Sequence, residues 1–303
     1  MGTDDGTFKS IERLLHSAAW IGQVPSLFWL NDYLTPWIGN RVAANNRHGS
    51  IRDLALKEVE SRKDRGSNRK DLLSKLLSVH DEKPEQFDYA ALVSMATSNI
   101  GAGSDTTAIS IRAAIFYLLR NPTAKQRLLD EIDFARSQGK LSDPLLLSEA
   151  NDMPYLQACL YEALRLHPAV GMSLPRVVPE GGTTVNGVYV PAGTIIGTNP
   201  WVVHRLQSIF GEDVDDFRPE RWLGADAADM RRFFFAFGAG ARSCIGRNIS
   251  WMEMSKLIPT LFMHFDLELE DSNEGLEEVC WWFVMQKGLH VRLRQRVVSD
   301  LED

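Results

Sequence analysis

Residues 233–250, FFFAFGAGARSCIGRNIS, gather unusual residue types around a single thiol, that of Cys244. Three glycines in this stretch permit positive φ angles and a close approach of the backbone to a bound group. A predicted helix starts just after Cys244, and the unpaired N–H groups at a helix N-terminus favour an anionic sulfur. Arg242, two residues before the cysteine, supplies a cation. These features indicate a loop that holds a thiolate against a flat, bulky group.

An axial thiolate ligand to haem iron accounts for all these features together. The glycine spacing is wrong for a dinucleotide-binding loop, G-x-G-x-x-G. A loop like that of tyrosine phosphatases requires an arginine where this chain has Ser250. A cysteine protease requires a partner histidine, which the sequence cannot place. A buried structural cysteine is the remaining alternative, because free cysteines are among the most buried residues.

The composition argues against several classes of protein. The chain has 303 residues and a net charge of −7, whereas nucleic-acid-binding proteins usually carry a basic stripe. Its three cysteines, Cys159, Cys244 and Cys280, have neither zinc-site spacing nor the even number of a disulfide framework. We therefore expect a reducing compartment. No stretch approaches 18 uninterrupted apolar residues, so we expect no membrane span. From the acidic charge we expect no nucleic-acid partner.

Helices dominate the predicted first part of the chain, residues 1–166. Apolar residues spaced three and four apart predict two short helices within residues 50–80. A long helix is predicted from about Phe87 to Leu119, because Pro122 stops it. A surface helix that ends at Gly139 and a helix from Pro154 to just before Pro168 follow.

The pattern changes to short strands in residues 167–303. Asn186-Gly187, between two β-rich runs, is the strongest short signal for a hairpin. A third strand, a loop, the cysteine stretch and a final helix follow, and the tail is predicted to form three short strands. A helix-rich first part with small sheets attached predicts a mainly α fold with small β-sheets, which we interpret as one unit over residues 1–303.

The segment FGAGARSCIG resembles the haem-binding loop of the cytochrome P-450 family, F-G-x-G-x-R-x-C-x-G. All six fixed positions match: Phe237, Gly238, Gly240, Arg242, Cys244 and Gly246. Further family motifs occur in family order, namely AGSDTT in the long helix, then EALR and FRPERW. The segments SNIGAGSDTTAIS, EALRLHPAVGMSLPRVVP and WVVHR are most similar to the fungal pisatin-demethylase-like group. The resemblance covers nearly all of the chain and implies the cytochrome P-450 fold.

The resemblance implies a cofactor site around the cysteine. Cys244 would bind the iron of haem b, and three loop residues, Phe237, Gly238 and Gly246, would line the cofactor. Haem carries two propionates, which need cations. Arg242 is one candidate, and Arg176, in LPRVV, is another by its position in the family.

Two further groups of residues receive roles by resemblance. Asp105 and Thr106 would relay protons to oxygen over the iron, and the small residues around them permit a kink or an opened hydrogen bond in the long helix. Glu162 and Arg165, three apart on one helix face, can pair locally. By resemblance Arg221 completes a buried cluster with them that is structural, not catalytic. WVVHRLQ has Leu206 where the family commonly has an acid.

The implied activity is that of a haem-thiolate monooxygenase, which inserts one atom of O₂ into a small apolar organic substrate by hydroxylation or demethylation in fungal secondary metabolism. Electrons would come from NADPH through a separate NADPH-cytochrome reductase. Four arginines near the cysteine loop could attract an acidic reductase surface. They are Arg231, Arg232, Arg242 and Arg247.

One departure from the family concerns the start of the chain. The family normally begins with a membrane-anchoring helix, a sheet portion and further helices, whereas this sequence begins in the region of the helices that cover the active site. We therefore expect the C-terminal portion of a cytochrome P-450 domain. Full-length relatives would lie on the cytoplasmic side of the endoplasmic reticulum, and a chain without the anchor would be cytoplasmic. Two alternatives are a truncated, inactive remnant that cannot hold haem, and a haem-thiolate isomerase or dehydratase, which typically lacks the acid–alcohol pair.

Overall fold

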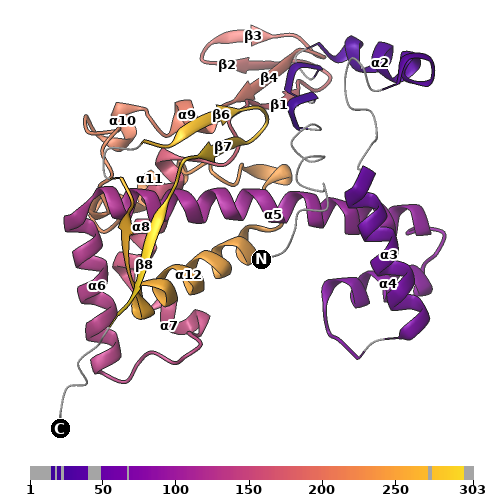
Figure 1. Cartoon of the computed structure of the whole chain (residues 1–303). Helices are drawn as coiled ribbons and strands as arrows, with labels where there is room; N and C mark the ends of the chain where they lie inside the picture. Colours follow the sequence, from indigo (N-terminus) through magenta and orange to yellow (C-terminus); the bar gives the residue numbers. More distant parts are fainter. Residues whose placement is uncertain are drawn as a thin grey trace. The chain divides into compact units, whose positions relative to one another are not determined.

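The computed structural model describes residues 15–17, 19–21, 24–39, 49–66, 68–271 and 275–296 (Figure 1). The chain divides into two compact units, Met1–Asp105 and Thr106–Asp303. The long helix α5, Tyr89–Arg120, spans the division and is helical throughout. Within the described residues, no helix is both long and apolar enough to cross a membrane.

The first unit contains α2 (Pro25–Ile38), α3 (Gly49–Arg65), α4 (Leu72–Glu82) and the start of α5. Asp71 caps α4, because its carboxylate accepts a hydrogen bond from the backbone N–H of Ser74 at 2.9 Å. The guanidinium of Arg62, on α3, binds the same carboxylate at 2.9 Å. These hydrogen bonds lower the pKa of Asp71 to about 2. A small apolar core around Val59, Leu92 and Val93 holds α3 and α5 together.

The second unit is built around helices that proline residues start. Pro122 opens α6 (Pro122–Ser137) and Pro154 opens α8 (Pro154–Leu166), where a missing N–H costs nothing. Both helices pack against α12 (Arg247–His264), and the short α7 (Leu147–Asn151) packs against α8 and α12. The core that they share contains fully buried side chains from the end of α5 and from α6, α8 and α12: Leu118, Leu128, Ile132, Leu156, Leu160, Ile258 and Phe262.

Short elements lie between α8 and α12. They are β1 (Leu174–Val177), β2 (Thr183–Val185), β3 (Val188–Val190), β4 (Ile195–Thr198), α9 (Pro200–Val203), α10 (Gln207–Phe210), η1 (Pro219–Trp222), α11 (Ala227–Arg232) and η2 (Gly240–Arg242). The predicted hairpin is confirmed as β2–β3, and both turn residues have positive φ, 49° for Asn186 and 80° for Gly187. β4 pairs antiparallel with β1 rather than with this hairpin.

The described part of the tail, residues 265–271 and 275–296, contains four strands where the sequence predicts three. They are β5 (Phe265–Leu269), β6 (Glu277–Cys280), β7 (Val284–Lys287) and β8 (Val291–Gln295). The prediction was wrong because VCWWFVMQK, which looks like one strand, reverses at Trp281–Phe283 and forms the β6–β7 hairpin. β5 pairs with β8, so these two strands of the tail lie side by side. The β6–β7 hairpin lies between them in the sequence. The expected mainly α fold with small β-sheets is confirmed.

Candidate functional site

The loop that carries Cys244 is fixed by backbone hydrogen bonds. The N–H of Cys244 donates to the carbonyl of Phe237 at 2.9 Å, and the N–H of Gly238 donates to that of Phe235 at 3.0 Å. Gly238 and Gly240 have φ angles of 67° and 69°, a region that side chains disfavour. The glycines of the motif therefore permit the fold of the loop itself.

The sulfur of Cys244 lies at the start of α12 and is exposed. Gly246 is the N-cap of this helix, and the helix begins at Arg247. A Cβ atom at position 246 would lie 3.7 Å from the Cys244 sulfur. Glycine therefore leaves this side of the sulfur open.

Two exposed arginines lie on segments next to the loop. Arg242 is the last residue of η2, two residues before the cysteine. Arg176 is in β1, two residues after Leu174, and residues two apart point to the same face of a strand. The Leu174 side chain lies 3.5 Å from where a Cβ of Gly238 would be, so this face of β1 is directed towards the loop. The side chain of Arg176 therefore starts from the face of β1 that is directed towards the loop.

Phe237 links the loop to the core of the second unit. Its ring centroid lies 6.3 Å from those of Phe234 and Trp251. The guanidinium of Arg247 lies 5.6 Å from the centre of the same ring. The first residue of the motif is therefore packed between the cluster of aromatic side chains and the first turn of α12.

The middle of α5 contributes hydroxyl groups and one carboxyl. Thr107 is buried, and its hydroxyl donates to that of Ser250, on α12, at 3.1 Å. Thr106, one residue earlier, accepts a hydrogen bond from the Ser110 hydroxyl through its carbonyl at 2.9 Å. Asp105 is half-buried, and within the described part of the chain its Oδ2 atom has no hydrogen-bond partner. Burial raises the pKa of the Asp105 carboxyl, so it retains its proton to a higher pH than an ordinary aspartate.

Glu162, Arg165 and Arg221 form one buried cluster. The Glu162 carboxylate binds Arg165 at 2.8 and 2.9 Å and Arg221 at 2.8 Å, and all three side chains are at most 1% exposed. Two more donors complete its shell, the indole N–H of Trp222 at 2.8 Å and the backbone N–H of Arg218 at 3.0 Å. A carboxylate with this many donors is fully satisfied without water.

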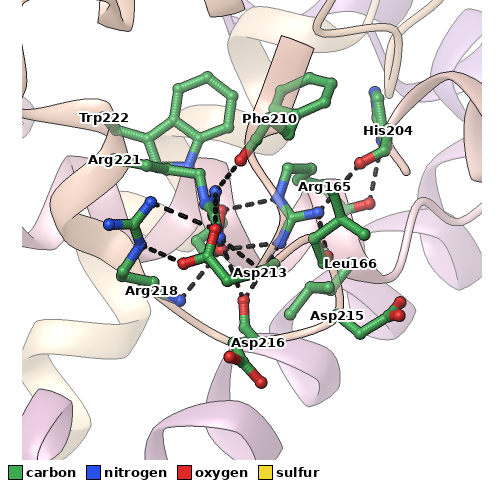
Figure 2. Close-up of polar contacts among 12 residues, drawn as sticks. Arg165, Leu166, His204, Phe210, Asp213, Asp215, Asp216, Arg218, Arg221 and Trp222 are labelled. Atoms are coloured by element: carbon green, nitrogen blue, oxygen red, sulfur yellow. Dashed lines mark hydrogen bonds and ion pairs between the residues drawn. The ribbon is translucent and has the colours of Figure 1, made fainter. Parts of the chain in front are cut away.

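The two arginines of the cluster also hold the segment between α9 and η1 (Figure 2). Arg165 donates to the carbonyls of Val214 at 2.6 Å and Asp216 at 3.2 Å. Arg221 donates to the carbonyls of Phe210 and Asp213, the latter at 3.0 Å. Because these acceptors are backbone atoms, no sequence motif could reveal them. The cluster fixes an irregular segment that has little regular secondary structure of its own.

His204 belongs to this arrangement and was not singled out from the sequence. It is fully buried at the end of α9. Its Nδ1 lies 3.0 Å from the carbonyl oxygen of Arg165, and its Nε2 accepts the N–H of Phe235 at 2.7 Å. Burial lowers the pKa of His204 to about 4, so the ring is neutral near pH 7. The only sequence signal was its place in WVVHR, which does not distinguish it from the other histidines.

Comparisons with known proteins assign the chain to a family. The family model described as Cytochrome P450 matches residues 3–291. Cytochrome P450 monooxygenase hepC from Aspergillus oryzae is 40% identical over 270 residues, which are 88% of this chain and 53% of that protein. Cytochrome P450 monooxygenase cicH from Emericella nidulans is 43% identical over 231 residues, 76% of this chain and 46% of that protein. Pisatin demethylase from Fusarium vanettenii is 46% identical over 186 residues, 61% of this chain and 36% of that protein.

The chain belongs to the cytochrome P450 family, as its motifs predict, and is similar to fungal monooxygenases that include pisatin demethylase. It spans about half the length of the first two of these relatives. Membership implies haem iron with a thiolate ligand. The residues around Cys244 fit that group, because the sulfur is exposed, Gly246 leaves its flank open and two exposed arginines lie on adjacent segments.

Proposed function

We propose that this chain carries the haem-thiolate half of a monooxygenase that inserts one atom of O₂ into a small apolar substrate. The observation that carries the proposal is the exposed Cys244 sulfur in a loop fixed by backbone hydrogen bonds at the start of α12. This arrangement would present the sulfur to a flat ligand.

Haem b, when bound, would supply the O₂-activating iron, and electron donation from the thiolate would favour O–O cleavage. Cys244 would be the iron ligand. Arg242 and Arg176 would bind the propionates, since guanidinium groups pair well with carboxylates. Gly238 and Gly246 would allow close approach of the backbone, and Phe237 would support the loop from the protein side.

Asp105 and Thr106 would deliver protons to the reacting oxygen. A carboxyl that retains its proton to a higher pH can act as a donor, and burial places Asp105 in that state more readily than a solvated aspartate. The Thr106 hydroxyl can both accept and donate a proton, so it can pass one on. This acid–alcohol pair favours oxygen chemistry over an isomerase or dehydratase reaction.

The electrons would come from NADPH through a separate NADPH-cytochrome reductase that docks near the cysteine loop. Arg232 and Arg242 are exposed there, while Arg231 also donates to the carbonyl of Trp222 at 3.3 Å. The reaction would be a hydroxylation or a demethylation in secondary metabolism, and the pisatin demethylase relatives are named for the second. The complete enzyme would act at the cytoplasmic side of the endoplasmic reticulum.

Thr106→Ala tests the proposal in a system reconstituted with haem and reductase. We expect NADPH consumption to continue while the hydrogen peroxide released per NADPH rises several-fold, because proton delivery fails. Ser104→Ala is the matched control, since this exposed hydroxyl on the same helix only donates back to the Ile100 carbonyl at 3.0 Å. Equal peroxide yields from both variants would remove Thr106 from the mechanism. A wild-type chain that binds no haem would instead support the inactive remnant.

A further inference from the structure

His204 connects three parts of the second unit that are far apart in the sequence. Its ring lies between the C-terminal turn of α8 and residue Phe235, which precedes the cysteine loop. Its own carbonyl accepts a hydrogen bond from Arg165 at 3.0 Å. The imidazole is stacked on Phe234, with ring centroids 5.5 Å apart and planes 8° apart. The ring is therefore held by hydrogen bonds at both nitrogens and by an aromatic contact on one face.

The two partners of the ring determine its tautomer. The carbonyl of Arg165 can only accept, so Nδ1 carries the proton. The backbone N–H of Phe235 can only donate, so Nε2 presents its lone pair. Protonation of Nε2 would direct two N–H groups at each other and break this contact. Only the neutral Nδ1–H form satisfies both partners.

The backbone bonds beyond Phe235 lead to the cysteine. The carbonyl of Phe235 accepts the N–H of Gly238 at 3.0 Å, and the carbonyl of Phe237 accepts the N–H of Cys244 at 2.9 Å. The N–H of Phe235 is thus fixed by His204 while its carbonyl fixes the first glycine of the loop. The backbone carbonyl of His204, rather than its ring, accepts from the Arg165 guanidinium, which is paired with the buried Glu162 carboxylate.

We propose that His204 is a positioning residue for Cys244, whose neutral imidazole ties the start of the cysteine loop to the end of α8. The functional meaning of this role rests on the proposed haem-thiolate function, but the positioning itself does not need haem. A ring without nitrogens would keep the stacking on Phe234 but would remove the partners of the partly buried Phe235 N–H and of the buried Arg165 carbonyl, which is costly. The loop should then open locally more often than in the wild-type protein.

Amide hydrogen exchange on the full chain without haem tests this role. We expect His204→Phe to speed exchange in peptides that cover residues 233–246 by about tenfold or more, because exchange reports local opening. His204→Gln retains an amide oxygen for the Phe235 N–H and should stay within about threefold of wild type. His167→Phe is the control, because His167 is equally buried but contacts Glu278 and Val284 in the tail. It should leave the loop peptides unchanged.

Unchanged exchange of the loop in His204→Phe would overturn the proposal, and so would equal acceleration in His167→Phe. Should His204→Phe fail to fold, the wild-type protein decides the question. Ring ¹⁵N chemical shifts of labelled histidine should show one Nδ1-protonated tautomer that persists well below pH 6.5. An Nε2-protonated ring at position 204 would contradict the geometry. Because no arm of the test contains haem, its failure is distinct from a failure of Cys244 to bind iron.

Discussion

Glu162→Gln tests how strongly the buried carboxylate stabilises the second unit. The carboxylate accepts five hydrogen bonds, two from Arg165 and one each from Arg221, Trp222 and the backbone of Arg218. Glutamine has nearly the same shape, but it removes the charge and turns an NH₂ group towards donors. Among the described residues, Arg165 then remains buried without a carboxylate partner, and Arg221 retains only Asp213, at 3.3 Å. Removing one partner of such a pair costs about 3–5 kcal/mol.

The loss is large relative to the whole stability of a domain, about 5–15 kcal/mol. Urea unfolding followed by far-UV circular dichroism should give the change as a lower midpoint with an unchanged slope. Asp229→Asn is the matched control, because its pair with Arg232 is 3.7 Å long and both side chains are about four-fifths exposed. Such pairs contribute at most about 1 kcal/mol. A loss below about 1 kcal/mol for Glu162→Gln, or one equal to that of the control, would refute the reasoning.

Two further changes test local features of the same unit. Leu206 is the N-cap of α10 and makes no side-chain cap hydrogen bond, so Leu206→Asp should raise the unfolding free energy by about 1 kcal/mol. Leu206→Ala also lacks an acceptor and should not raise it. Equal urea midpoints for the two variants would contradict the expected capping by Asp. The pKa of His204 falls on folding from 6.5 to about 4 through burial, with Arg165 and Arg205 as the charged groups that face it. Its unfolded form therefore binds a proton first as the pH falls below 6.5, and the native state loses stability between pH 6.5 and 4. Between pH 7.5 and pH 5, the wild type should lose about 2 kcal/mol of unfolding free energy relative to His204→Gln, as measured by urea unfolding. A difference that does not change with pH would contradict the burial of a neutral ring.

Two helix starts and one hairpin of the second unit could be predicted because local chemistry determines them. Pro122 and Pro154 set helix starts, and Asn186-Gly187 sets a hairpin, since each acts through its own φ angle. The pairing of β4 with β1 joins residues about 20 apart, with a complete hairpin between them. Nothing in the local pattern chooses between that partner and the nearer hairpin.

The sequence predicts which side chains form the candidate site but not which groups they bind. The residues of the cysteine motif and of the Glu162 cluster are visible as types at fixed spacing. Their partners in the structure are mostly backbone atoms, such as the carbonyls of Val214 and Asp216 that bind Arg165. His204 was missed for the same reason, because both of its ring nitrogens face backbone groups. Backbone partners of this kind cannot be recognised from the residue types in a sequence.

The reduced, CO-bound absorption spectrum of the 303-residue chain, expressed with a haem precursor, shows whether Cys244 binds haem iron. We expect the red-shifted Soret band of a thiolate-ligated carbonyl complex in the wild type and its loss in Cys244→Ser. Cys280→Ser, which removes another exposed thiol, should retain the band. A wild-type chain without the band, or a Cys244→Ser variant that keeps it, would contradict the assignment of Cys244 as the iron ligand.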